Sequence, residues 1–278
     1  RGGGPAMRVR TAGLYLAALA LAAFLIGPFA WMVSTAVKSR DEIFTTPPTW
    51  WPHAPSWDGF AAAASTDVLA SFGNSALVCV GTTALCMVLA LLACYPLSRT
   101  RVRWRGGVLG AILVSQLLPH AVLLLPIYRT ARELGMLNTR WGLVVAMLAF
   151  TLPVGIWLLH GYLASVPMSV EEAARIDGLS QFSAYWRVTV PLALPGVSAV
   201  AVYVFFSAWQ DFVFAMVFLT DPALGTTPLA LLGLIGQNSV DWSVLMAAST
   251  IMMVPVVALF ALVQRSFVGG LTAGAVKG

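Results

Sequence analysis

The chain has 278 residues, of which 59% are hydrophobic and only 10% are charged. Soluble globular proteins carry about 25% charged residues, so this composition excludes a soluble domain and indicates a protein that spans a lipid bilayer. The net charge of +5 comes from Lys and Arg residues in short segments between apolar runs. This pattern indicates membrane orientation, and we expect no nucleic-acid partner.

Six apolar segments are long enough to cross the hydrocarbon core, which takes about 20 residues of helix. They predict an all-α, polytopic integral membrane protein with six transmembrane helices, at residues 14–34, 72–97, 107–128, 141–163, 192–220 and 244–264. We expect a tail at 1–13, a six-helix membrane domain at 14–265 and a second tail at 266–278.

The first span follows Arg8 and Arg10, as the apolar region of a signal peptide would. It is longer than such a region and ends without a small-residue cleavage site, so we interpret it as uncleaved. The next segment, residues 38–70, is interrupted by prolines and charges and cannot be a membrane helix. It is the longest expected outer loop, and its tryptophans are typical of the headgroup level.

The distribution of Lys and Arg predicts which loops face the cytoplasm. If both termini share a side with the loop near 98–106 and the loop 166–191, that side carries 11 of the 16 basic residues. The positive-inside rule then places both termini and the loop 166–191 in the cytoplasm. The densest basic group is interpreted as a membrane anchor and consists of Arg99, Arg101, Arg103 and Arg105.

Groups that could carry catalysis are few. Cys79, Cys86 and Cys94 lie too far apart along one predicted helix for a disulfide, so we expect buried thiols. The histidines have no metal-ligand spacing, and the sequence contains no zinc-protease, serine-hydrolase or P-loop motif. We therefore predict no catalytic residue, no metal site and no cofactor bound by this chain.

The segment 169–191, SVEEAARIDGLSQFSAYWRVTVP, is the main polar interruption between two apolar spans. Ser169 followed by Glu172 is a capping-box pattern, which predicts a helix of about eight residues starting there. Glu171 and Arg175 have the spacing of an ion pair on one helix face, and Gly178 has the position of a left-handed stop.

A second short helix is expected after Gly178, with an apolar face formed by Phe182, Tyr185 and Trp186. Pro191 then marks the entry into the fifth span. The segment therefore predicts two short helices that meet at a bend and lie across the membrane plane.

This spacing resembles the EAA loop of the membrane subunits of bacterial ABC importers. The pattern of that loop is EAA, three residues, Gly, nine residues and I-x-L-P. The matching positions here, with Val in place of Ile and Leu, are Glu172, Ala173, Ala174, Gly178, Val188, Val190 and Pro191.

Two further segments resemble the MalG-like carbohydrate permeases. SAWQDFVFAMVFLTD at 207–221 is similar to their Trp-Asn-(Asp/Glu)-Phe region, with Gln210 in place of Asn, and QRSFVGGLTAGAVKG at 264–278 is similar to their ending. The resemblance implies the MetI-like permease fold of a type I ABC importer with a cytoplasmic coupling helix, in the bacterial plasma (inner) membrane.

The resemblance implies a non-catalytic permease subunit that forms half of the translocation pathway for a carbohydrate, with a di- or oligosaccharide favoured. The implied partners are a second, different permease subunit, a homodimeric cytoplasmic ATPase that binds ATP and Mg²⁺, an extracytoplasmic sugar-binding protein, and membrane lipid. The residues implied in coupling to the ATPase are Glu171, Glu172, Ala173, Ala174, Arg175, Asp177, Gly178 and Pro191.

Candidates for contact with the substrate follow from polar groups within spans. Trp209, Gln210 and Asp211 offer an aromatic face and hydrogen-bonding groups, although Asp211 alternatively ties helices together near the outer end. Weaker candidates, which alternatively join one helix to another, are Asn74, Gln116 and His120. Three alternatives stay open: an importer for another small polar solute, a secondary carrier and an intramembrane enzyme.

Overall fold

The computed structural model describes residues 5–65, 67–100, 103–236 and 240–275, with side chains described between residues 11 and 263. In this part of the chain the regular elements are all helices, and Ile235 and Val240 form an isolated β-bridge. The all-α class predicted from the sequence is confirmed. The chain divides into two compact units, described separately here: Arg1–Leu69 with Leu231–Met253, and Ala70–Ala230 with Val254–Gly278.

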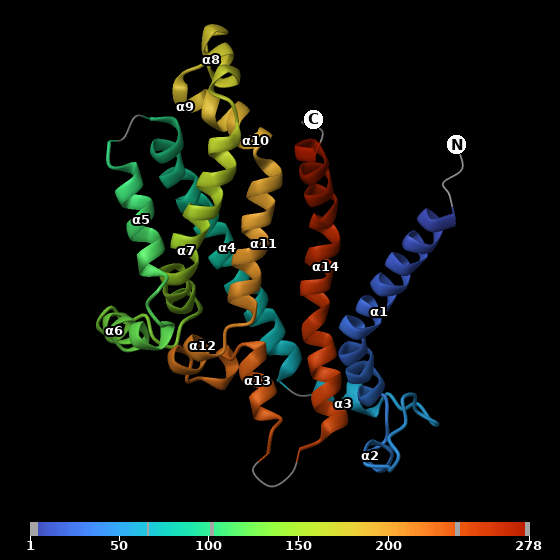
Figure 1. Ribbon diagram of the computed structural model, residues 1–278. Coiled ribbons are helices and arrows are strands. Elements are labelled where there is room, and N and C mark those ends of the chain that lie inside the picture. Colours follow the sequence, from blue (N-terminus) through green and yellow to red (C-terminus); the bar gives the residue numbers. More distant parts are fainter. Residues whose placement is uncertain (1–4, 66, 101–102, 237–239, 276–278) are drawn as a thin grey trace. The chain divides into compact units, whose positions relative to one another are not determined.

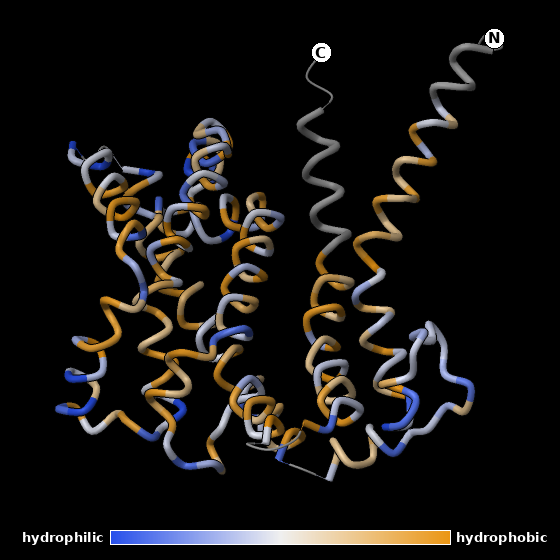
Figure 2. Tube along the Cα trace, turned by 60° about the horizontal axis from the view of Figure 1, so that its bottom comes forward, coloured by the Kyte–Doolittle hydropathy of each residue, from blue (hydrophilic) through white to orange (hydrophobic). Residues whose placement is uncertain are grey.

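The first unit contains α1 Pro5–Ala36, α2 Arg40–Ile43, α3 Asp58–Ser65 and the first turns of α14 Trp242–Ala275. From residue 11 onward α1 carries apolar side chains around its whole circumference, and most of them are exposed. A helix that is apolar on every side is stable in lipid rather than in water. Figure 2 shows α1 and α14 as largely apolar stretches.

The short helix α3 packs against the backbone of the first unit at Gly59. A Cβ atom on Gly59 would lie 2.8 Å from the carbonyl oxygen of Ala36 and 2.9 Å from that of Ser243. Only glycine allows this approach, so Gly59 brings α3 against the end of α1 and the start of α14. The backbone N–H of Ser56 also donates to the carbonyl of Val37, at 2.9 Å.

The second unit is built around three helices that enclose a buried core: α4 Val68–Arg99, α7 Arg140–Ser165 and α11 Leu194–Trp209. Leu159 and Val200 lie in this core with two of the expected buried thiols, Cys86 and Cys94. Outside the 166–191 loop this unit also contains α5 Arg105–Ser115, α6 His120–Glu133, α12 Val213–Phe218, η2 Pro222–Leu224, the first residues of α13 Thr227–Gly233 and the part of α14 from Val254 onward.

Within the described residues, four helices are long and apolar enough to cross a membrane singly, and two bent helix pairs raise the number to six. The single helices are α1, α4, α7 and α14. The bent pairs are α5 with α6, at 97°, and Gln181–Leu192 with α11, at 77°. Six spans are therefore present if each bent pair forms one span.

Two of the predicted spans are not continuous helices, and the sequence-based prediction was wrong there. The third breaks at 116–119 because Pro119 lacks an N–H and takes an extended conformation, with φ −58° and ψ 131°. The predicted fifth span, 192–220, contains a helix that ends at Trp209, and Val213 starts the separate helix α12. Apolar runs mark the presence of these segments but not their breaks.

The two ends of the second unit carry different structures. Figure 1 shows the helices labelled α8 and α9, which belong to the 166–191 loop, at one end of the α7 and α11 pair. Helices α6 and α12 lie at the other end. The 166–191 loop and the break after Trp209 are thus separated by the length of α11.

Candidate functional site

The 166–191 loop folds as two short helices, as predicted, followed by a distorted turn. The first helix is α8 Met168–Ile176 and the second is α9 Gln181–Ala184. The chain continues through a π-helical turn, η1 Tyr185–Thr189, and α10 Val190–Leu192. Gly178 lies between the two helices with φ +95°, so the predicted stop by a glycine with positive φ is confirmed.

The predicted capping box is not formed. Helix α8 starts one residue earlier than expected, after Pro167, and no side chain caps its first turn. Pro167 sets this start because its ring fixes φ near −58° and its extended ψ of 137° turns the chain into the helix. The side-chain cap occurs in the second helix, where the Ser180 hydroxyl accepts a hydrogen bond from the Ser183 N–H at 3.2 Å.

The outer surface of α8 is formed by the residues that carry the resemblance to the EAA loop. Glu172, Ala173 and Arg175 are exposed, and Ala174 is half-buried. Ile176, at the end of the helix, is 86% exposed. Asp177, Gly178 and Pro191 are also exposed. All but one of the predicted coupling residues are therefore accessible at least in part.

The exception is Glu171, whose side chain is buried on the inner face of α8. Its Oε2 lies 3.1 Å from the Nε of Arg99 and accepts a hydrogen bond from the Thr189 hydroxyl at 2.8 Å. The predicted ion pair of Glu171 with Arg175 is wrong, because Glu171 points toward the end of α4 while Arg175 is exposed.

Arg99 does not have the exposed position that the sequence predicts for it. It was interpreted as a membrane anchor, but it is only 5% exposed. Its Nη2 donates to the carbonyl of Leu163 at 2.7 Å and its Nη1 to the carbonyl of Val166 at 3.1 Å. The carbonyl of Leu163 also accepts a hydrogen bond from the backbone N–H of Val166 at 3.3 Å, and the cation supplies further donors at this end of α7. Arg103 and Arg105 are exposed, and Arg101 lies outside the described residues.

The predicted aromatic face of the second helix packs onto α4. The hydroxyl of Tyr185, which is fully buried, donates to the carbonyl of Leu91 at 2.8 Å. The ring of Tyr95 contacts the rings of Tyr185 and Phe182 edge-on, with centroids 5.1 Å and 5.3 Å apart. The loop is therefore held to α4 by aromatic packing as well as by polar contacts.

The main candidates for substrate contact lie together at the opposite end of α11. Trp209 is buried, with its ring stacked on Phe205 at 5.7 Å and edge-on to Phe72 at 5.5 Å. Gln210 is exposed where α11 ends. Asp211 is half-buried, and its Oδ2 accepts a hydrogen bond from the backbone N–H of Ala215 in α12, at 3.0 Å.

The weaker candidates occupy separate positions. Asn74 is buried and donates to the carbonyls of Ala223 and Gly225 while its oxygen accepts two hydrogen bonds from Arg140, contacts that fit the alternative role of joining segments. Gln116 follows the last residue of α5. His120 starts α6 with its ring 4.4 Å from that of Phe150.

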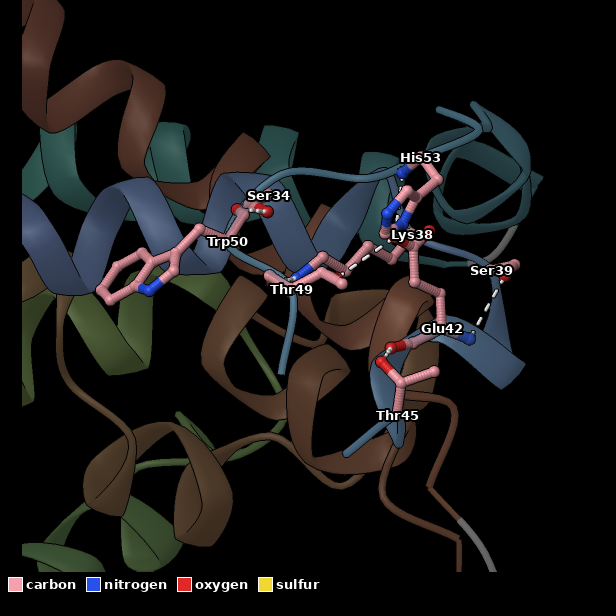
Figure 3. Close-up of polar contacts among 8 residues, drawn as sticks. All are labelled: Ser34, Lys38, Ser39, Glu42, Thr45, Thr49, Trp50 and His53. Carbon is pink, nitrogen blue, oxygen red and sulfur yellow. Dashed lines mark hydrogen bonds and ion pairs between the residues drawn. The ribbon is translucent and has the colours of Figure 1, made fainter. Parts of the chain in front are cut away.

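The segment after α1 in the first unit forms a second polar cluster, drawn in Figure 3. The Lys38 ammonium is buried, donates to the carbonyl of Thr49 and lies 4.4 Å from the ring centroid of Trp31. The carboxylate of Glu42 accepts a hydrogen bond from the His53 N–H and contacts the His53 ring nitrogen, both at 2.9 Å. These two contacts lower the pKa of Glu42.

This arrangement is that of a polytopic helical membrane protein with a polar helical loop fixed to one end of its spans. The chain belongs to the family of binding-protein-dependent transport system inner membrane components, whose model matches residues 87–272. The predicted family is confirmed, and with it the membrane location.

The sequence is also similar to those of known transport proteins along most of its length. It is 35% identical over 252 residues to the sulfoquinovosyl glycerol transport system permease protein SmoH of Agrobacterium fabrum, covering 90% of this chain and 88% of SmoH. It is 33% identical over 255 residues to the diacetylchitobiose uptake system permease protein DasC of Streptomyces coelicolor, covering 91% of this chain and 92% of DasC.

The fold is also similar to that of a solved transporter. A chain from the crystal structure of a bacterial ABC transporter involved in the import of the acidic polysaccharide alginate matches with a TM-score of 0.81 and 20% identity. The match covers 96% of this chain and 99% of that chain. The predicted importer-permease fold is therefore confirmed.

Proposed function

We propose that this chain is a non-catalytic permease subunit that forms half of the translocation pathway of an ATP-driven carbohydrate importer. The observation that carries the proposal is the surface of α8, where the exposed Glu172, Ala173 and Ile176 lie on a helix fixed from its other side. The small Ala173 beside these residues lets another protein approach the outer surface of α8 closely. The sugar compounds named for SmoH and DasC support the substrate class.

The proposed partner at α8 is a homodimeric cytoplasmic ATPase, which binds the ATP and Mg²⁺. This assignment places the α8 loop and both termini in the cytoplasm, in agreement with the excess of Lys and Arg there. The partner contacts are assigned to Glu172, Ala173, Ala174, Arg175, Asp177 and Gly178. Pro191 is assigned to the junction between the loop and α11.

The same mechanism requires a second, different permease subunit and an external sugar-binding protein, consistent with the family's description as binding-protein-dependent. When the two ATPases close on ATP, the docked loops move and the spans open outward to receive the sugar. Inward release follows hydrolysis. The external protein selects the sugar, which this chain then passes through the membrane.

The proposed sugar contacts lie at the end of α11, at Gln210 and Asp211. Trp209 is buried against Phe205 and Phe72, so we assign it to supporting these two residues. His120 is a further candidate, because its ring lies beside Phe150, whose ring is 4.9 Å from that of Phe214 in α12. The amide of Gln210 and the carboxyl group of Asp211 can both hydrogen-bond to the hydroxyls of a sugar. Gln116 is a more distant candidate, and the contacts of Asn74 favour a structural role.

The test is reconstitution of the complete transporter in vesicles, with the sugar chosen by calorimetry of the binding protein against a panel. Glu172→Lys is expected to abolish uptake and to reduce co-purification of the ATPase. The matched control is Glu133→Lys, an exposed charge reversal on α6 at the other end of the unit. Full uptake by the Glu172→Lys complex, or uptake by this chain alone driven by an ion gradient, contradicts the proposal.

A further inference from the structure

One buried side chain at the end of α4 joins the α8 loop to two membrane helices. Arg99 is the last residue of α4, and its guanidinium contacts the carboxylate of Glu171 in α8 and the two carbonyls that end α7. Its own carbonyl accepts a hydrogen bond from the Gln181 side chain in α9, at 3.2 Å. A single residue therefore contacts α7, α8 and α9 from α4.

Glu171 extends these contacts to the turn that leads into α11. The oxygen that faces Arg99 also accepts the hydrogen bond from Thr189, which lies in η1 and is itself fully buried. Arg99, Glu171 and Thr189 thus form a continuous polar chain from the end of α4 to the segment before α11. The side chains of all three are excluded from solvent.

Because these side chains are buried, their contacts hold α8 in one orientation. An ion pair of this kind adds little stability over a well-packed apolar pair, but breaking it leaves a charge without water or partner. Helix α8 cannot rotate or tilt away from α4 and α7 unless Arg99 and Glu171 separate. The geometry of these two residues is therefore suited to fixing an orientation rather than to raising stability.

The outer surface of α8 has the opposite character. Glu171 is 2% exposed on the inner face, whereas Ile176 at the tip is 86% exposed. A partner that moves the tip applies its force through a helix of nine residues. Without a fixed point on the inner face, such a helix would swing on the flanking turns at Pro167 and Gly178 instead of moving the spans.

We propose that Arg99 and Glu171 are positioning residues that make α8 move as one body with α4 and α7, so that movement of the ATPase reaches the membrane helices. This inference rests on the proposed function. It assigns to Glu171 a role in transmitting the movement of the ATPase to the membrane helices, whereas the exposed residues on the same helix contact the ATPase.

The test compares sugar uptake with ATP hydrolysis in vesicles containing the complete transporter. Glu171→Gln keeps the shape of the side chain but removes the charge, and we expect at least a fivefold fall in sugar imported per ATP hydrolysed, with the ATPase still bound. Arg99→Lys keeps the charge but loses the forked donors, and we expect a partial fall. The control Arg103→Gln removes an exposed arginine four residues further on and should leave the ratio unchanged.

If a single change at Arg99 or Glu171 impairs folding, a variant that replaces both residues tests the inference instead. Arg99→Met combined with Glu171→Leu leaves no lone buried charge, so we expect the protein to fold. Hydrogen exchange in α8 of the assembled transporter should rise in this variant, and the ratio of uptake to hydrolysis should fall. A ratio equal to that of the unmodified transporter overturns the inference. Failure of the unmodified transporter to import any sugar overturns the proposed function instead.

Discussion

The side chain of Tyr162 in α7 occupies the space that a side chain at Gly196 in α11 would need. A Cβ atom on Gly196 would lie 2.1 Å from the Cγ and 2.5 Å from the Cβ of Tyr162. The two helices therefore approach each other closely at a position where α11 has no side chain, a common arrangement between membrane helices. This contact lies near the start of α11, close to where the 166–191 loop ends.

Gly196→Ala is expected to separate α7 from α11 and to lower the free energy of unfolding by about 1–3 kcal/mol, as overpacked cores do. The control is Gly161→Ala, one residue before Tyr162, where an added Cβ meets no atom within 4 Å. Thermal unfolding in detergent measures both variants. Equal melting temperatures for the two would show that the helices do not meet in this way.

Gly178→Ala tests the turn between α8 and α9. An added Cβ meets nothing within 4 Å, so the only penalty is the backbone φ of +95°. Residues with side chains pay about 1–2 kcal/mol in the left-handed region. We expect faster hydrogen exchange in α8 and reduced uptake, whereas the control Gly106→Ala, which also meets no atom within 4 Å, should change neither.

Tyr185→Phe removes the hydroxyl that donates to the Leu91 carbonyl but keeps the ring packed against Tyr95. The expected loss is about 0.5–1.5 kcal/mol, the usual net contribution of one hydrogen bond. Tyr203→Phe serves as the control because its side chain is exposed on α11. Melting temperatures that fall equally in both variants would contradict the assigned role of the Tyr185 hydroxyl.

The segment after α1 should lose stability in acid. Hydrogen bonds from the His53 backbone and ring lower the pKa of Glu42 below its usual value of 4.5. A carboxyl group with a lowered pKa in the folded state stabilises the fold above its unfolded pKa, and this contribution disappears as pH falls through the folded value. The loss therefore begins near pH 4.5 and continues below it.

The fluorescence of the tryptophans in residues 50–57 is expected to report this transition. Glu42→Gln should reduce the pH dependence, whereas Glu133→Gln should leave it unchanged. Asp241 contributes in the same direction. Burial raises its pKa, but the hydrogen bonds from Arg40 and Ser243 outweigh this effect, so that the pKa is lowered overall. A titration curve unaffected by Glu42→Gln would contradict the structural role of the Glu42 and His53 contact.

Local patterns predicted the apolar segments, the two short helices of the 166–191 loop and the stop at Gly178. They failed where distant segments decide the outcome. Arg99 follows an apolar run, as a membrane anchor does, and only the return of α7 and α8 to the end of α4 makes it a buried ion-pair partner. The predicted ion pair of Glu171 with Arg175 failed for the same reason. Spacing along one helix cannot reveal a partner 72 positions earlier in the chain.

The cysteines of α4 give the protein a practical property. Cys79, Cys86 and Cys94 are all free and buried, with exposures of 1%, 0% and 0%. Thiol reagents act on accessible thiolates, so these three side chains should be silent toward maleimides in the folded chain. A single cysteine placed at Ile176 would then be the only site to accept a fluorescent dye, with no need to replace the native thiols first.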